Sequence, residues 1–187
     1  MNFESVQNSP NRVKEIVPIA QLASDLKSGQ VPNYSHIILN QCHEMHGLAE
    51  CPISEELIRT GDSAISDIVK QIMASSLWAT PKNNAIVVTW DEDDRTTKGA
   101  QGCCGFEPKS AANFGGGHIA TIVITSHGAR RVTDATPYNH YSLLRTVEDA
   151  FGIHKYLNHA NDTAAGIKSM SPLFASQVAS VTPSKLP

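Results

Sequence analysis

The sequence predicts a single α/β domain, a layered and mostly parallel sheet with flanking helices. Short runs rich in Ile, Val and Thr alternate with longer stretches whose apolar residues recur at helical spacing. The aliphatic runs lack the polar alternation of a half-exposed strand, so they indicate strands buried on both faces, as parallel strands are. With 187 residues and 41% hydrophobic content, the chain is long enough for one such domain, predicted at residues 1–175 and followed by a polar tail at 176–187.

Three segments are expected to form the strands of this sheet. They are SHIILN (35–40), AIVVTW (85–90) and IATIVIT (119–125). In open α/β sheets, ligands bind beyond the carboxyl ends of the strands. The residues that follow each strand are therefore the first candidates for a functional site.

Two segments are expected to form helices that cover the sheet. The first, residues 61–78, has Asp62 as its expected N-cap, and the second, residues 139–153, is expected to stop at Gly152. Their core-facing residues are expected to be Ile65, Ile68, Val69, Ile72 and Met73 in the first and Leu143, Leu144, Val147 and Phe151 in the second.

Composition excludes several classes of function. The formal net charge of −3 provides no basic field, so no nucleic-acid partner is expected. No apolar run approaches the roughly 20 residues of a transmembrane segment, and the N-terminus MNFESVQNSPNRVKEIVP has none of the regions of a signal peptide. The sequence leaves the localisation open.

The four cysteines do not form a zinc motif. Cys103 and Cys104 are adjacent, and neighbouring cysteines rarely bond to each other without strain. In an oxidised protein we therefore expect a bridge from one of them to Cys42 or Cys51.

Clusters of metal-ligand residue types follow the first two expected strands. After the first come Asn40, His43, Glu44 and His46, and after the second comes the acidic run DEDD (91–94). Four adjacent carboxylates stay ionised only if water or a cation neutralises them, so the run is either a solvated turn or part of a divalent metal site. Carboxylate oxygen with imidazole nitrogen suits Zn, Fe or Mn, whereas carboxylates alone suit Mg or Ca.

Two further histidines have two interpretations each. The three glycines before His118 allow unusual backbone conformations that would bring this imidazole to a ligand, or they make a tight entry into the next strand. In a parallel sheet His118 would lie at the wrong edge for a site with Asp91, unless the long loop folds back. His140, near a helix N-terminus, is either a site residue or a cap.

Several motifs, in order, resemble the phosphoesterase family that includes bacterial acid phosphatases and phospholipase C-type enzymes. These motifs are VPNYSHIILNQCHEMHG (31–47), VTWDE (88–92), GCCG (102–105), GGGHIATIVIT (115–125) and YNHYSLLRTVEDAFGI (138–153). The similarity runs from about Asn2 to Phe174. Membership implies an alkaline phosphatase-like fold, of which this chain would supply part, and proteins that are often secreted or periplasmic.

The resemblance implies a hydrolase of phosphoric esters that depends on a divalent metal ion. It assigns Asp91 and Glu92 to metal, and it places the catalytic histidines His46 and His118 at metal or phosphate. Glu44 stands where the family has aspartate, so it keeps the carboxylate and extends its reach by one methylene. Leu39 stands where the family has proline, which removes a constraint on the loop.

Family members carry an upstream strand, an EN metal motif and a nucleophile segment that this sequence does not match. We therefore expect the chain to correspond to the C-terminal portion of such an enzyme and to be inactive alone. The alternative is a catalytically inactive, truncated homologue that binds a metal or a partner. In either case a missing N-terminal half would leave an unpaired sheet edge, which favours self-association.

Overall fold

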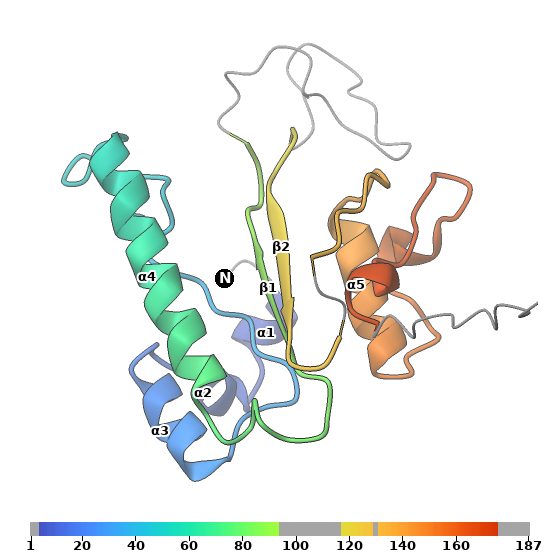
Figure 1. The fold of residues 1–187 in the computed structure, drawn as a ribbon, viewed down its shortest axis with the longest axis horizontal. Coiled ribbons are helices and arrows are strands. Elements are labelled where there is room, and N and C mark those ends of the chain that lie inside the picture. The colour runs from blue at the N-terminus through green and yellow to red at the C-terminus, as the bar shows by residue number, and fades with distance from the viewer. Residues whose placement is uncertain (1–3, 94–116, 129–130, 176–187) are drawn as a thin grey trace, which may run out of the picture. The chain divides into compact units, whose positions relative to one another are not determined.

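The computed structural model describes residues 4–93, 117–128 and 131–175. The chain divides into two compact units, Met1–Thr80 and Pro81–Pro187 (Figure 1). The described part is mixed α/β, with helices in both units and a small two-stranded sheet in the second. The predicted polar tail, residues 176–187, lies outside the described residues.

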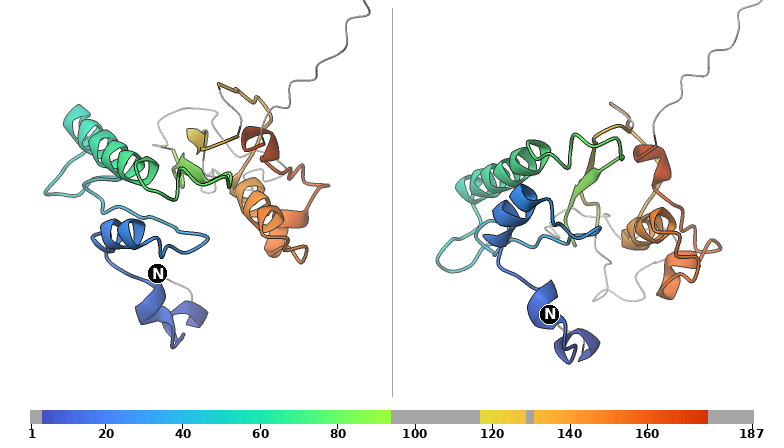
Figure 2. Two further views of the ribbon diagram at one scale, coloured as in Figure 1. Left: turned by 60° about the horizontal axis from the view of Figure 1, so that its bottom comes forward. Right: turned by 90° about the horizontal axis from the view of Figure 1, so that it is seen from below.

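The first unit is helical. Its longest element is α4, a continuous helix in all three views (Figures 1 and 2). A glycine in the left-handed region, Gly29 at φ +72°, ends α3. The helices are α1 (Glu4–Gln7), α2 (Arg12–Glu15), α3 (Gln21–Ser28) and α4 (Glu55–Met73).

Helix α4 starts earlier and ends earlier than the pattern at 61–78 predicts. Its N-cap is Ser54 rather than Asp62, because the Ser54 hydroxyl accepts a hydrogen bond from the Leu57 N–H at 3.1 Å. Glu55 and Glu56 then place negative charge at the positive end of the helix dipole. The aliphatic face is half-buried up to Ile72, but Met73 is 42% exposed, so the prediction that Met73 belongs to the core is wrong.

The expected strand at 35–40 is absent. These residues have no regular secondary structure, and Ile38 is 67% exposed. A β-strand needs backbone hydrogen bonds to a neighbouring strand. Within the described ranges, residues 35–40 pair with no other strand. An apolar run alone does not supply that partner.

The sheet consists of β1 (Ala85–Thr89) and β2 (Thr121–Thr125), and the two strands are antiparallel. Pairing runs from Ala85 opposite Thr125 to Thr89 opposite Thr121, so the layered parallel sheet is not found in the described residues. Most of the side chains are half-buried or exposed, and only Thr125 is fully buried. Continuous aliphatic runs indicate a strand but not its direction, which is why the parallel prediction failed.

Helix α5 (His140–Ala150) confirms the helix predicted at 139–153. Leu143, Leu144 and Val147 are half-buried, but Phe151 lies beyond the end of the helix and is 47% exposed, so the prediction that Phe151 belongs to the core is wrong. It begins with a capping box, in which the Asn139 side chain accepts from the Ser142 N–H and the Asn139 N–H donates to the Ser142 hydroxyl. The expected stop, Gly152, has φ +67° and follows the C-cap. Two short 3₁₀ helices follow, η1 (Asn158–Asn161) and η2 (Ser171–Leu173).

The core of the second unit forms around α5. Ile167 and Met170 are buried, and so are the polar residues Ser142 and Thr146. The Thr146 hydroxyl donates to the Ser142 carbonyl and accepts from the Met170 N–H, both at 2.7 Å. These bonds fasten the segment before η2 onto α5. None of the described helices has the length and apolar character needed to cross a membrane.

Candidate functional site

The loop at 40–51 in the first unit carries Glu44 and His46. A disulfide joins Cys42 to Cys51, with the two Cα atoms 5.6 Å apart. This pairing contradicts the expected bridge to Cys103 or Cys104, both of which lie outside the described residues. The chain reverses between Leu48 and Cys51, whose backbones exchange two hydrogen bonds of 3.1 Å, and this reversal returns Cys51 to Cys42.

Short-range hydrogen bonds give the same loop a defined shape. The Asn40 side-chain oxygen accepts from the Cys42 N–H at 3.2 Å and lies 2.6 Å from Nδ1 of His43. The Gly47 N–H donates to the Gln41 carbonyl at 2.9 Å. We did not predict the pairing of Asn40 with His43, although asparagine beside a turn is a common signal for such bonds.

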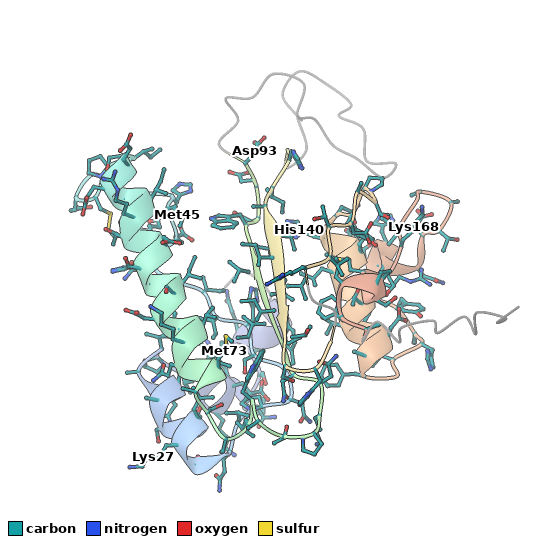
Figure 3. All side chains as sticks on the ribbon, viewed as in Figure 1. Lys27, Met45, Met73, Asp93, His140 and Lys168 are labelled. Atoms are coloured by element: carbon teal, nitrogen blue, oxygen red, sulfur yellow. A yellow bond between two sulfur atoms is a disulfide. The ribbon has the colours of Figure 1, made fainter. Side chains whose placement is uncertain are left out.

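Met45 seats this loop on α4. Its backbone is in the left-handed region at φ +75°, which is uncommon for a residue with a side chain. A Cβ atom added to Gly61 of α4 would lie 2.6 Å from Cγ of Met45, so the Met45 side chain fills the space beside this glycine. Figure 3 labels Met45 beside α4. Glu44 is half-buried beside this contact, and His46 is exposed.

The end of the β1–β2 hairpin, in the second unit, carries the other predicted site residues. Asp91 and Glu92 follow β1, and His118 precedes β2. Because the strands are antiparallel, the end of β1 and the start of β2 lie at the same edge of the sheet. The objection that His118 would occupy the wrong edge therefore disappears, since it assumed parallel strands.

The pairing register aligns these residues further. Thr89 is opposite Thr121, and the two hydroxyl oxygens are 2.9 Å apart. Continued beyond the ladder, the same register aligns Glu92 with His118 and Asp93 with Gly117. A contact agrees with this alignment: a Cβ atom added to Gly117, which has φ +74°, would lie within bonding distance of the Asp93 carboxylate. The Gly117 backbone thus lies so close to Asp93 that no residue with a Cβ atom would fit there.

Asp91 makes two hydrogen bonds, one with its side chain and one with its main-chain carbonyl. One of its carboxylate oxygens accepts from the Glu92 N–H at 3.0 Å. Its main-chain carbonyl lies 2.9 Å from Nε2 of His140, the first residue of α5. Figure 3 labels Asp93 beyond β1 and His140 on α5. The N-terminus of α5 therefore lies against the acidic segment, a position that the sequence left open.

A hydrogen-bonded turn leads into α5. Asp134 accepts from the Thr136 N–H at 2.9 Å and from the Tyr138 hydroxyl at 2.8 Å. Hydrogen bonds from Thr136 and then Tyr138 hold the pKa of Asp134 below its ordinary value. Burial and the bond to Asp134 raise the pKa of Tyr138. The phenol stays protonated and the carboxylate stays charged, which keeps this bond intact across the neutral range.

The predicted metal ligands have suitable chemistry but no complete site in the described residues. Carboxylate oxygens and imidazole nitrogens are ordinary ligands of divalent metals. Within residues 4–93, 117–128 and 131–175, however, no three His, Cys, Asp or Glu side chains come together as a metal site requires. Glu44 and His46 belong to the first unit, and Asp91, Glu92 and His118 belong to the second.

Comparison with known proteins decides the family. The model of the phosphoesterase family matches residues 2–154. The chain belongs to the phosphoesterase family. The match includes the bridged loop, both strands and all of α5, so every predicted site residue lies within it. The resemblance inferred from the motifs is confirmed.

A curated relative of this chain is the phosphatidylinositol-3-phosphatase of Mycobacterium tuberculosis (strain ATCC 25618 / H37Rv). It is 25% identical to this chain over 155 residues. The aligned region covers 83% of this chain and 40% of the relative, so the chain spans about two fifths of that protein's length. No solved structure matches this chain.

Proposed function

We propose that this chain contributes to a metal-dependent hydrolase of phosphoric esters of the acid phosphatase or phospholipase C type. The observation that carries the proposal is the antiparallel hairpin, because it brings Asp91, Glu92 and His118 to one edge of the sheet. Family membership supports the reaction class. The relative named as a phosphatidylinositol-3-phosphatase supports a phosphate monoester as the substrate, with a lipid headgroup as one carrier.

In the proposed enzyme, carboxylates and imidazoles have separate tasks. Asp91 and Glu92, in the second unit, supply oxygen ligands to a divalent metal, which when bound would stabilise negative charge on phosphoryl oxygens. Glu44, in the first unit, is a further carboxylate ligand that the family motif implies. His46 and His118 are both exposed, so their rings can reach a substrate. As imidazoles they would donate a hydrogen bond to a phosphoryl oxygen or carry a proton to the departing alcohol.

A second candidate is a homologue that binds metal or a partner without turnover. It is favoured by one observation, that no set of three metal-binding side chains comes together in the described ranges. In this case Asp91 and Glu92 would still bind a divalent ion, with weaker affinity than a complete site gives.

The two candidates differ in hydrolysis and share metal binding. The test uses the purified full chain with Mn²⁺, Zn²⁺ or Mg²⁺. Hydrolysis is followed with p-nitrophenyl phosphate and with vesicles containing phosphatidylinositol 3-phosphate, and metal binding is followed by calorimetry. Each measurement is repeated with Asp91→Asn and Glu92→Gln. The matched control is Asp67→Asn, which removes an acid on the exposed side of α4.

Metal-stimulated hydrolysis that Asp91→Asn reduces at least 100-fold, and Asp67→Asn leaves unchanged, supports the hydrolase. Metal binding that the same variant weakens, with no hydrolysis of either substrate, supports the second candidate. A wild-type chain that neither binds metal nor hydrolyses an ester contradicts both.

A further inference from the structure

The contact between His140 and Asp91 joins two elements that are far apart in the chain. Nε2 of His140 lies 2.9 Å from the main-chain oxygen of Asp91, across 49 residues. A carbonyl oxygen can only accept a hydrogen bond, so Nε2 carries the hydrogen in this contact. The ring is therefore a donor aimed at the backbone of the acidic segment.

The base of this side chain is firmly placed. His140 is the first residue of α5, directly after the Asn139 cap, whose box with Ser142 closes at 3.1 and 3.3 Å. Ser142 is fully buried, and one turn later Thr146 is hydrogen-bonded to Met170. Because α5 is anchored at these points, its first residue has a fixed position in the second unit.

The acidic segment gains a tertiary anchor from this bond. The β1–β2 ladder ends at the pair of Thr89 and Thr121, so Asp91 and Glu92 lie beyond the strand. The bond between the Asp91 carboxylate and the Glu92 N–H is local to the segment and ties it to no other element. The His140 ring links the segment to α5.

We propose that His140 is a positioning residue, which holds the backbone of Asp91 against the N-terminus of α5 and so orients the Asp91 and Glu92 carboxylates. It touches neither substrate nor metal in this role. The inference rests on the proposed function to the extent that these carboxylates hold a metal. The hydrogen bond itself is a property of the metal-free chain and is tested separately.

Two substitutions separate the ring hydrogen from the bulk of the ring. In His140→Gln the amide nitrogen reaches about as far as Nε2 and can donate to the same carbonyl. In His140→Phe the ring remains but the donor is lost. The control is His154→Gln, which changes an exposed histidine in the same unit.

The first measurement is backbone amide exchange of residues 85–93 in the metal-free chain, with thermal melting to show that each variant is folded. We expect His140→Phe to raise exchange at residues 90–93 about tenfold, and His140→Gln and His154→Gln to keep the wild-type pattern.

The second measurement is the affinity of each variant for Mn²⁺, by calorimetry. His140→Phe should weaken it 10- to 100-fold, the usual loss when a group that orients a ligand is removed, and His140→Gln should restore it to within about threefold.

The proposal is overturned if His140→Phe exchanges and binds Mn²⁺ like the wild type, or if His140→Gln is as impaired as His140→Phe. Failure of the proposed function has another signature. If the wild type itself binds no Mn²⁺, the metal site is wrong, and the exchange comparison alone decides whether His140 holds the segment.

Discussion

Two regions carry the predicted site residues, and they are shaped in opposite ways. The loop at 40–51 is closed by its own disulfide and by hydrogen bonds that span only a few residues. The hairpin end at Asp91 and His118 depends on a strand ladder and on the bond from Asp91 to His140, which join residues about 30 to 50 positions apart. Local chemistry shapes the first region, and the tertiary fold shapes the second.

This difference explains how each region should respond to damage. The loop should lose its shape when its own bonds or its contact with Gly61 of α4 are removed, and changes in the second unit should leave it intact. The hairpin end should lose its structure when either Gly117 or the start of α5 is altered. Each unit has one tryptophan, Trp78 near the end of the first and Trp90 near the start of the second. In a Trp90→Phe background fluorescence follows the first unit, and in a Trp78→Phe background it follows the second.

Removal of the disulfide should have the largest effect. The double change Cys42→Ser with Cys51→Ser opens a loop with a sequence separation of 9. Loop-closure entropy predicts a loss of about 2.5 kcal/mol in the free energy of unfolding of the first unit. Urea unfolding followed through Trp78 measures it. A loss of equal size reported by Trp90 would show that the two regions do not respond independently.

Gly117→Ala should have the next largest effect, on the hairpin end. Alanine would be strained at φ +74°, and its Cβ would collide with the Asp93 carboxylate. We expect a loss of about 2 kcal/mol in unfolding free energy. Gly152→Ala is the matched control, since Gly152 also has positive φ but nothing lies within 4 Å of its added Cβ. Calorimetric melting measures the loss of unfolding free energy in both variants, and the difference between them reports the collision with Asp93. Equal losses in Gly117→Ala and Gly152→Ala would contradict a contribution from that collision.

Loss of a helix cap should cost less and should distinguish the regions. Asn139→Ala and Ser54→Ala each remove a side-chain cap, from α5 and α4 respectively. Each should lower unfolding free energy by about 1 kcal/mol. Only Asn139→Ala should also raise amide exchange at residues 90–93, because it loosens the base of His140. The same exchange increase in Ser54→Ala would contradict this link.

The smallest effect concerns the turn before α5. The pKa of Asp134 is lowered by the bonds from Thr136 and Tyr138, so its stabilising contribution is complete above the ordinary value of 3.8. It is lost as pH falls through the lowered pKa. Asp134→Asn should therefore reduce melting temperature at pH 7 and have less effect near pH 2. Thermal melting of the wild type and Asp134→Asn at both pH values measures this effect, with Asp67→Asn as the control for an exposed acid. A difference in melting temperature between wild type and Asp134→Asn that grows toward low pH would contradict the prediction.

Local signals in the sequence predicted local structure well. Helix α5 was found because Asn139, the apolar spacing and Gly152 all lie within one short segment. The start of α4 was missed because two polar residues, Ser54 and Asp62, both suit an N-cap, and only the hydrogen bond to Leu57 distinguishes them. The segment 35–40 has the composition of a strand, but composition does not provide a partner to pair with.

The sequence by itself determined the family, the helix α5, two strands and the residue types of the candidate site, because each depends on neighbouring residues or on motifs in order. Only the tertiary structure decided the pairing of Cys42 with Cys51, the antiparallel direction of β1 and β2, and the approach of His140 to Asp91. Each of these depends on which parts of the chain meet in space. For His118 the direction of the strands was decisive, because it brings this residue to the same edge as Asp91.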